Sequence, residues 1–267
     1  MARASKAITK PAAPKGQELA TVDAELAAFA SNITTFVSAP SGNKIKVDPS
    51  GDFILPGGEN IGKQFNAVIV NFVGTNKFYD VPYRDGAPTA PACYAIGHAA
   101  VMNLKPEADS PNIQSDTCHS CPMGGVNAFG THQNGKSKAC SNRYIAALRV
   151  DDPNDPDALA DERGTVYLLE IPPTSLKSFE GAVNGVARSL GGHPVKAIFT
   201  ITGTPRGTYA TIDFSDPVPN PNYAMHFAQG KTAEDALMRK PDFAAAAAAA
   251  PPSRSRAAAR PRTPARR

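Results

Sequence analysis

The chain has no tryptophan, only four cysteines among 267 residues, and no apolar run that approaches the length of a membrane span. The last absence excludes a membrane-spanning protein. Residues 1–15 are basic but have no apolar central stretch, so we do not expect a secretory signal. The expected compartment is a reducing cytosol, where clustered cysteines bind metal more often than they form disulfides.

Signatures of several enzyme classes are also missing. The sequence has no glycine-rich phosphate loop that ends in Lys-Ser or Lys-Thr, and no HExxH motif. The acidic pairs Asp151-Asp152 and Asp161-Glu162 could bind a divalent cation, as in a nuclease or another metal hydrolase. A solvated turn is the favoured interpretation, because the pairs fall in a polar loop. We therefore expect a protein that is not an enzyme.

Acidic residues are absent from both ends of the chain. Residues 1–15 carry four basic side chains, and residues 251–267 carry six arginines. Because the whole chain carries a formal charge of +4, removing these ten positive charges leaves the body at −6. The six arginines could contact nucleic acid nonspecifically through its phosphates. A solubilising or partner-binding extension is the alternative.

Twenty-five prolines and 21 glycines favour short strands joined by turns. Strands are predicted at 44–47, 52–55, 65–72, 78–81, 144–150, 165–171, 195–202 and 209–214. Gly74-Thr75-Asn76 is interpreted as a turn between two of them. Helices are predicted over about 175–190 and around 231–239, and an apolar stripe from Leu19 to Ile33 predicts another.

These elements predict a mainly β protein of the α+β class with few helices. The expected architecture is an OB-like bent barrel over residues 17–230, with an insertion at about 82–142. A two-sheet sandwich is the competing architecture. Residues 1–16 are expected to form a disordered basic arm, and residues 231–267 a short helix followed by a disordered Ala/Pro/Arg tail.

The insertion contains all four cysteines. Cys118 and Cys121 are two residues apart, which allows one tight turn to hold a metal ion, and Cys93 and Cys140 can complete a tetrahedron. A loop of this length needs something to fix it, so we expect a structural zinc ion. The alternatives are four unpaired buried cysteines, or a mixed site that includes the nearby His98, His119 or His132.

Basic and aromatic residues lie on the same insertion and beside it. Cations can meet phosphates and rings can stack on unpaired bases, so this combination is typical of a surface that binds single-stranded nucleic acid. Taken singly, the aromatic residues could be core and the lysines solvated. The candidate residues are Tyr79, Tyr83, Arg84, Phe129, Lys136, Lys138 and Arg143.

At these residues the chain resembles a set of bacteriophage single-stranded DNA-binding proteins. The resemblance covers roughly residues 65–215, and the cysteine segment is its most specific part. It is also distantly similar to the zinc-containing single-strand binding proteins of T4-like phages, in which a metal subdomain is inserted in an OB-fold. The matching segments are Tyr79–Tyr83, Pro91–Tyr94, Gln114–Pro122, Asn127–Gly130, Gly135–Cys140, Ile171–Ser175 and Ile212–Phe214.

The resemblance implies a protein that coats single-stranded DNA in the cytoplasm of a bacterial host, during phage replication or recombination. It implies Zn²⁺ as the cofactor, single-stranded DNA and phage replication or recombination proteins as partners, and no membrane association. The chain departs from the family in ending with arginines rather than an acidic tail. An alternative function is a zinc-stabilised structural or protein-interaction protein that contacts DNA only through its basic tails.

Overall fold

The computed structural model describes residues 43–80, 90–151, 155, 157–241 and 243. In this part of the chain, eight strands form one sheet in the order β2-β1-β6-β5-β3-β7-β8, and β4 also pairs with β3. The strands are β1 (Lys44–Val47), β2 (Phe53–Ile54), β3 (Gln64–Phe78), β4 (Cys93–Gly97), β5 (Cys140–Val150), β6 (Val166–Ile171), β7 (Ala197–Pro205) and β8 (Ala210–Pro219).

Three α-helices and three 3₁₀ turns accompany the sheet in the described residues. They are η1 (Val101–Asn103), η2 (Pro173–Ser175), α2 (Leu176–Ser189), η3 (Pro194–Lys196), α3 (Tyr223–Thr232) and α4 (Glu234–Leu237). The prediction of a mainly β, α+β protein is confirmed, and the strands belong to one curled sheet rather than to a two-sheet sandwich. No described helix has both the length and the apolar character needed to cross a membrane.

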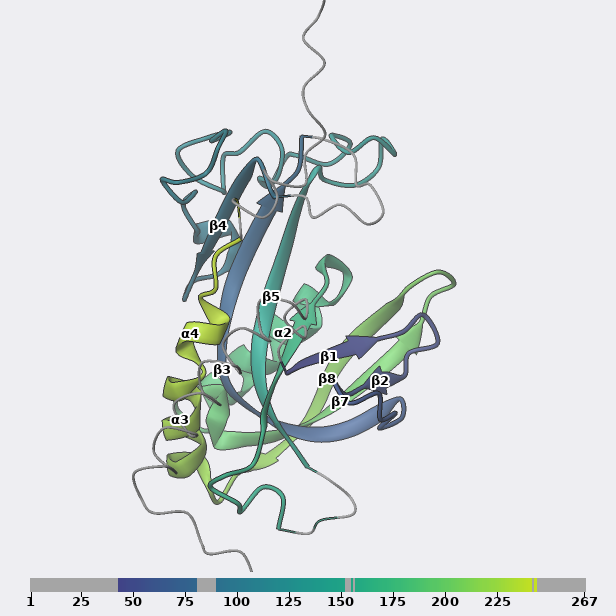
Figure 1. Cartoon of the computed structure of the whole chain (residues 1–267), viewed down its shortest axis with the longest axis vertical. Helices are drawn as coiled ribbons and strands as arrows, with labels where there is room; N and C mark the ends of the chain where they lie inside the picture. Colours follow the sequence, from purple (N-terminus) through teal and green to yellow (C-terminus); the bar gives the residue numbers. More distant parts are fainter. Residues whose placement is uncertain (1–42, 81–89, 152–154, 156, 242, 244–267) are drawn as a thin grey trace, which may run out of the picture. The chain divides into compact units, whose positions relative to one another are not determined.

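The central strand β3 is continuous, so the turn predicted at Gly74-Thr75-Asn76 is wrong. Gly74 serves another purpose, because a Cβ atom there would lie 2.6 Å from the carbonyl oxygen of Ala99. The glycine lets the insertion pass closely over the strand. A register shift between Ile69 and Asn71 bends β3, and Figure 1 shows its long curve.

On one of its sides, β3 pairs with two different strands, one for each half of its length. The first half pairs with β7, the second half pairs with β4, and β5 runs along nearly the whole strand on the other side. The turn between β1 and β2 curls round to β7, since a Cβ atom on Gly51 would lie 2.7 Å from the Gly203 carbonyl oxygen. This backbone contact brings one end of the sheet against β7, the neighbour of the strand at the other end.

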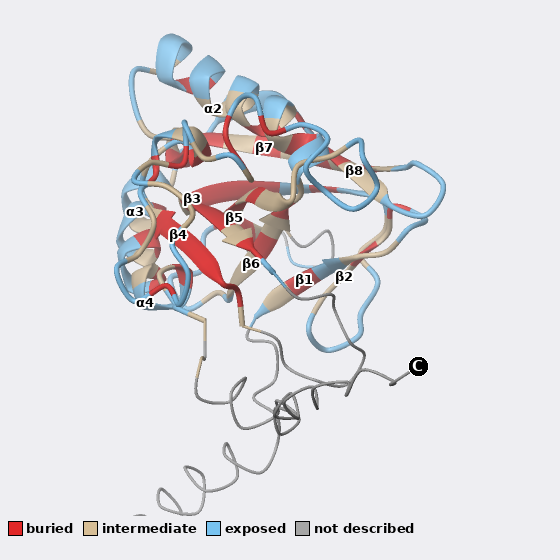
Figure 2. Cartoon of the chain, turned by 90° about the horizontal axis from the view of Figure 1, so that it is seen from above, coloured by how far each residue is buried: buried red, intermediate tan, exposed pale blue. Residues whose placement is uncertain are grey.

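The largest buried cluster among the described residues lies between the curled sheet and helix α2, and a second includes Ala233 and Leu237 of the C-terminal helical region. Phe179 of α2 packs edge-on against Phe72 and Phe214, and the ring centroids are 5.3 Å and 5.2 Å apart, respectively. The centroid of the Tyr144 ring lies 5.0 Å from that of Phe179. Strands β3, β4 and β5 are largely buried, whereas the outer face of α2 is exposed (Figure 2). The predicted apolar face of the 175–190 helix is therefore confirmed.

The insertion between β3 and β5 holds the cysteines, and it also contains β4 and η1, which the sequence analysis did not predict. The C-terminal helical region begins at Tyr223, earlier than expected. Several predicted features lie outside the described residues: the arm 1–16, the Leu19–Ile33 stripe, the tail 244–267, and the candidates Tyr83 and Arg84.

Candidate nucleic-acid interface

Two strands and one loop bring the four cysteines to one place. Cys93 begins β4 and Cys140 begins β5, and both are in register with Phe78 of β3. Cys118 and Cys121 come from the loop that passes over this end of the sheet. All four line one cavity of about 10 Å³, whose described lining also includes the Asn76 side chain. A volume of this size holds about one water-sized particle.

Close backbone approaches shape the loop around Cys121. The amide N–H of Gly125 donates to the Cys121 carbonyl at 2.8 Å. A Cβ atom on Gly124 would lie 2.7 Å from the Cβ of Cys140, and one on Gly125 would strike the carbonyls of His119 and Cys121. Larger residues at these two positions would therefore move Cys121 away from Cys140.

A buried amide pair forms the floor beneath the cysteines. Asn142 donates to the Asn76 side-chain oxygen at 2.8 Å, and Asn76 donates to the Val101 carbonyl at 2.6 Å. Burial raises the pKa of Cys118, although a hydrogen bond with Asn76 opposes the shift. These contacts tie the insertion to β3 and β5 at the point where the cysteines gather.

The electrostatics of the cavity favour a cation. Burial and the other three cysteines raise the pKa of Cys140 to about 12. A buried thiol with a raised pKa stays protonated unless a positive charge stabilises its thiolate, which is what a bound transition metal does. Four cysteines are a set of ligands that structural zinc sites use.

The sulfur atoms are not gathered tightly in the structure. Among the described residues, no three or more His, Cys, Asp or Glu side chains form a group that could hold a metal ion. The register explains this, because Cys93 and Cys140 lie two strands apart, or about 10 Å. Binding would require the cysteine side chains to rotate inward around the cavity.

The histidines considered as alternative ligands lie elsewhere. The Nε2 atom of His98 lies 2.7 Å from a carboxylate oxygen of Glu234 and its Nδ1 atom lies 3.1 Å from the Phe72 carbonyl oxygen, so both ring nitrogens already have a partner. His132 lines the groove described next, and neither it nor His119 is among the described residues that line the cysteine cavity. The arrangement favours four sulfur ligands over the mixed set.

A groove of about 1100 Å³ lies beside the cysteine cavity, along the start of β5, before its pairing with β6 begins at Tyr144. Its walls come from the end of β3, the 129–138 loop and η2. Tyr79 and Phe129 are exposed, with Phe129 71% accessible, and the ammonium group of Lys138 sits 4.9 Å from the Phe129 ring centroid. Of the predicted residues, the groove brings together Tyr79, Phe129, Lys138 and Arg143.

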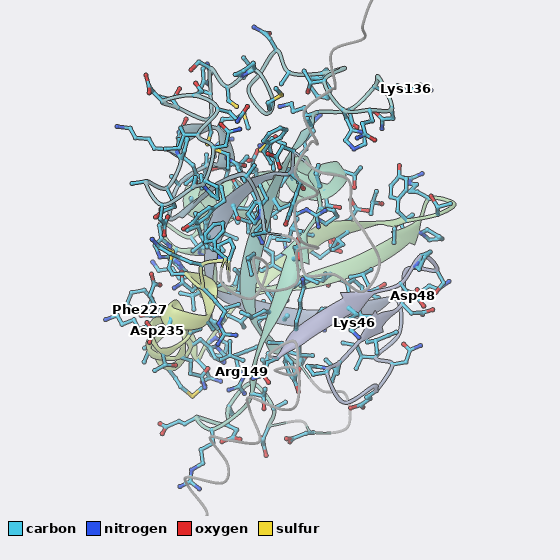
Figure 3. The ribbon with its side chains drawn as sticks, turned by 45° about the horizontal axis from the view of Figure 1, so that its top comes forward. Lys46, Asp48, Lys136, Arg149, Phe227 and Asp235 are labelled. Carbon is cyan, nitrogen blue, oxygen red and sulfur yellow. The ribbon has the colours of Figure 1, made fainter. Side chains whose placement is uncertain are left out.

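Lys136 lies on the same loop without lining the groove. The Asn134 side-chain oxygen accepts from the amides of Lys136 and Ser137 at 2.9 and 3.0 Å, which folds the loop tip tightly. The Lys136 side chain is exposed and projects from the insertion, on the side away from Phe227 of α3 (Figure 3). It can therefore reach a ligand that leaves the groove.

A cluster of charges on the sheet face adds three groups that the sequence analysis missed: Glu170, Lys44 and Lys77. Glu170 binds Lys44 and accepts from Arg143 at 2.6 Å. Burial opposes ionisation of Glu170, but Lys44, Arg143 and Lys77 together lower its pKa. Lys77 lines the groove, and burial lowers its pKa. Three cations around one carboxylate leave this face net positive.

Lys77 could have been recognised from the sequence. In a strand, alternate side chains share a face, so Lys77 points to the same face as Tyr79, while Asn76 and Phe78 face the cysteines. The incorrectly predicted turn at residues 74–76 concealed this alternation. Lys44 was not recoverable in this way, because its place depends on the parallel pairing of β1 with β6.

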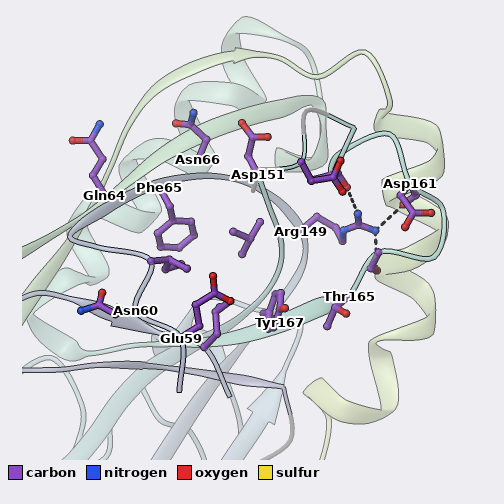
Figure 4. Close-up of a pocket in the computed structure, with 16 residues that line it drawn as sticks. Glu59, Asn60, Gln64, Phe65, Asn66, Arg149, Asp151, Asp161, Thr165 and Tyr167 are labelled. Carbon is purple, nitrogen blue, oxygen red and sulfur yellow. Dashed lines mark hydrogen bonds between the residues drawn. The ribbon is translucent and has the colours of Figure 1, made fainter. Parts of the chain in front are cut away.

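A second hollow, of about 660 Å³, lies at the opposite end of β5 (Figure 4). The buried Arg149 guanidinium donates to the carbonyls of Ala158, Asp161 and Gly164, with the last bond 2.8 Å long. Carboxylates also line the hollow and outnumber the arginine. The hollow is therefore an unfavourable place for a polyanion, and these carboxylates are the reason. They are Glu59, Asp151, Asp155 and Asp161.

Comparison of the chain with models of protein families, with curated proteins and with solved structures gave no match.

Proposed function

We propose that this protein binds single-stranded DNA in the groove between β5 and the 129–138 loop, without altering it chemically. The observation that carries the proposal is the groove lining, which contains two exposed aromatic rings together with Lys77, Lys138 and Arg143. Rings stack on bases at about 1–3 kcal/mol each, and cations contact phosphates. Bound protein would cover and protect unpaired DNA during replication or recombination, as the resemblance to phage proteins implies.

The strand connections support an OB-like barrel. Strands β3, β5, β6, β7 and β8 pair in the order β6-β5-β3-β7-β8, with α2 between β6 and β7. In OB-folds, the second and third strands and the loops L12 and L45 bind oligonucleotides. By this correspondence, the first loop is the cysteine insertion and the second is the β7–β8 turn, which carries the exposed Arg206 and Tyr209.

A zinc ion belongs to the same proposal. Cys93, Cys118, Cys121 and Cys140 would hold it, and it would supply folding free energy to the insertion rather than chemistry. Cys140 lines both the cavity and the groove. Fixing its position therefore fixes the wall of the groove on which Lys138 and Phe129 lie.

The test is fluorescence anisotropy with labelled oligo(dT), duplex DNA and oligo(rU) at two salt concentrations. We expect oligo(dT) to bind more tightly than duplex DNA, with affinity falling as salt rises. Phe129→Ala and Lys138→Glu should each weaken binding about tenfold. Lys63→Glu is the matched control, because it makes the same charge change at an exposed position beside the opposite end of β3.

Four results would contradict the proposal. The groove has no role if Lys138→Glu and Lys63→Glu weaken binding equally. Loss of all binding on removal of residues 1–16 and 244–267 would instead favour an interaction protein with DNA-binding tails, which the acidic body permits. Mg²⁺-dependent cutting of the probe would reveal a nuclease. Tighter binding of oligo(rU) than of oligo(dT) would reassign the ligand to RNA.

A further inference from the structure

The acidic hollow, at the end of β5 remote from the groove, combines negative charge with an apolar floor. Four carboxylates and one guanidinium line it, which leaves a net charge of −3. Among the described residues, none of these four carboxylates belongs to an ion pair. The apolar floor consists of Leu55, Ile61, Phe65, Val150 and Tyr167. A hollow with this lining suits a cationic side chain that is accompanied by an aromatic one.

The arginine in the hollow does not satisfy its carboxylates. Arg149 is only 2% exposed, and its guanidinium donates to three backbone carbonyls of the 158–164 loop. Glu59 enters the hollow from the segment before β3, and Asp151 enters it from the end of β5 (Figure 4). Within the described residues, neither carboxylate accepts a hydrogen bond. Both are therefore available to a cation that comes from outside.

The turn between β7 and β8 has the complementary chemistry. Arg206 and Tyr209 are exposed there, with Tyr209 49% accessible. The amide N–H of Arg206 donates to the Tyr209 carbonyl at 2.7 Å, directly beyond the last strand pair, Pro205 with Ala210. Gly207 has a φ of +76°, which glycine adopts at little cost. The closed turn thus presents an arginine and a tyrosine at the tip of a hairpin that extends from the sheet (Figure 1).

This tip does not occupy the hollow of its own chain. Neither Arg206 nor Tyr209 is among the described residues that line the hollow. Gln64, which does line it, lies opposite Thr202, and the turn lies further along the hairpin. A contact between tip and hollow therefore joins two copies of the chain. Because the two surfaces differ, the contact is head-to-tail and builds a ring or an open chain of copies.

We propose that the acidic hollow of one copy receives the β7–β8 tip of a second copy, with Arg206 among the carboxylates and Tyr209 on the apolar floor. Arginine forms paired hydrogen bonds with carboxylates, and Tyr and Arg are common anchors of protein interfaces. The closed turn loses little conformational freedom on docking. A four-residue tip buries less surface than a stable dimer needs, so we expect a dissociation constant on the order of 0.1 mM.

Analytical ultracentrifugation of the full-length protein without DNA, from about 10 µM to about 1 mM, measures this association. We expect the average mass to rise with protein concentration and to fall as salt is added, because the contact depends on charge. Arg206→Glu should weaken association at least about tenfold. Arg188→Glu is the matched control, since it makes the same charge change at an exposed position on α2, and it should leave association within about twofold.

Reversing the charge on both sides provides the second readout. Glu59→Lys with Asp151→Lys changes the net charge of the hollow from −3 to +1 and should also abolish association. An equimolar mixture of this variant with Arg206→Glu should associate again. In the mixture, an acidic tip meets a basic hollow and an arginine tip meets an acidic hollow. The melting temperature of each variant checks its fold, and Glu59→Gln with Asp151→Asn is the milder variant, which should weaken association about threefold or more.

Three results would overturn the inference. Unchanged protein that stays monomeric up to about 1 mM lacks the contact. A mixture of the two charge-reversed variants that does not associate shows that tip and hollow do not meet. Unchanged association in Arg206→Glu, together with weaker oligo(dT) binding by that variant, assigns the tip to DNA instead. The inference does not depend on the groove, which Lys138→Glu tests separately in dilute protein.

Discussion

Cys93 and Cys140 lie directly opposite the same residue, Phe78, on the two strands that flank it. Because residues opposite each other in an antiparallel sheet share a face, both thiols point toward the loop that carries Cys118 and Cys121. The sheet thus presents one half of a four-cysteine set and the insertion presents the other half. Any ion held between them would join the loop to two strands, β4 and β5, at once.

Purified protein is expected to contain about one equivalent of zinc per chain, and Cys118→Ser or Cys140→Ser should remove it. Elemental analysis measures the metal content. Chelation should lower the melting temperature by about 10 °C or more, because each kcal/mol shifts it by about 2–4 °C in a domain of this size. Metal-free protein that melts at the same temperature as freshly purified protein would contradict the site.

The matched controls for the zinc site are His119→Ala and His132→Ala. Both should retain the full metal content, since neither histidine is among the described residues that line the cavity. Loss of zinc in either variant would revive the mixed ligand set.

Glu170→Gln should strengthen DNA binding, by about three- to tenfold at low salt. The change removes the one negative charge from the cluster that includes Lys77 and Arg143. Anisotropy titration measures the effect. Glu59→Gln, in the acidic hollow at the other end of β5, is the control and should change affinity much less. Weakened binding in Glu170→Gln would show that positioning of Arg143 matters more than net charge.

Gly230→Ala should destabilise the protein by about 1–3 kcal/mol, because the added methyl group would push α3 away from the Val70 carbonyl. Urea denaturation gives the free energy of unfolding. Gly181→Ala in α2 is the control, since a Cβ atom there meets nothing within 4 Å. It should stabilise by about 0.5–1 kcal/mol through helix propensity alone. Equal effects of the two substitutions would exclude the contact.

Acid should destabilise the protein through His226. Burial, and then the charge of Arg149, lower the pKa of His226 to about 4, whereas an unfolded histidine titrates near 6.5. Between these values the unfolded chain binds the additional proton, so stability falls as the pH drops from about 6.5 to about 4. The full loss is about 3 kcal/mol.

Urea denaturation between pH 7.5 and 4.5 measures this loss, and His226→Gln removes the titrating group. Its stability should change less over this range than that of the unchanged protein. Parallel curves for the two proteins would show that other groups cause the acid sensitivity.

Local patterns predicted most of the fold. The alternation in 144–150 and 165–171, the 175–190 stripe and the paired 44–47 and 52–55 segments all correspond to observed elements. The error at Gly74 has a physical cause, since a glycine required for close packing has the same appearance in sequence as one required for a turn. Strand β4 was missed because both of its faces are buried by contacts between segments, so its residues do not alternate between polar and apolar.

The candidate site was predictable in part. Spacing alone indicated that Phe129, Lys138 and Arg143 belong together, because a short loop and one strand join them. The pairing of Lys44 and Arg143 with Glu170 depends on the lateral order of β1, β6 and β5, which no local pattern specifies. The same holds for Phe243 and Tyr94, which are far apart in the chain and meet through packing.

The parallel pairing of β1 with β6 has a consequence for how the chain acquires its structure. Asn43, just before β1, donates to Val166, 123 residues further along the chain. During synthesis the first strand leaves the ribosome long before its partner exists, and contacts of such sequence separation slow folding. We expect residues 43–55 to be the last strands to join the sheet. Nascent chains that stop short of β6 should therefore be cleaved readily by proteases within residues 43–55.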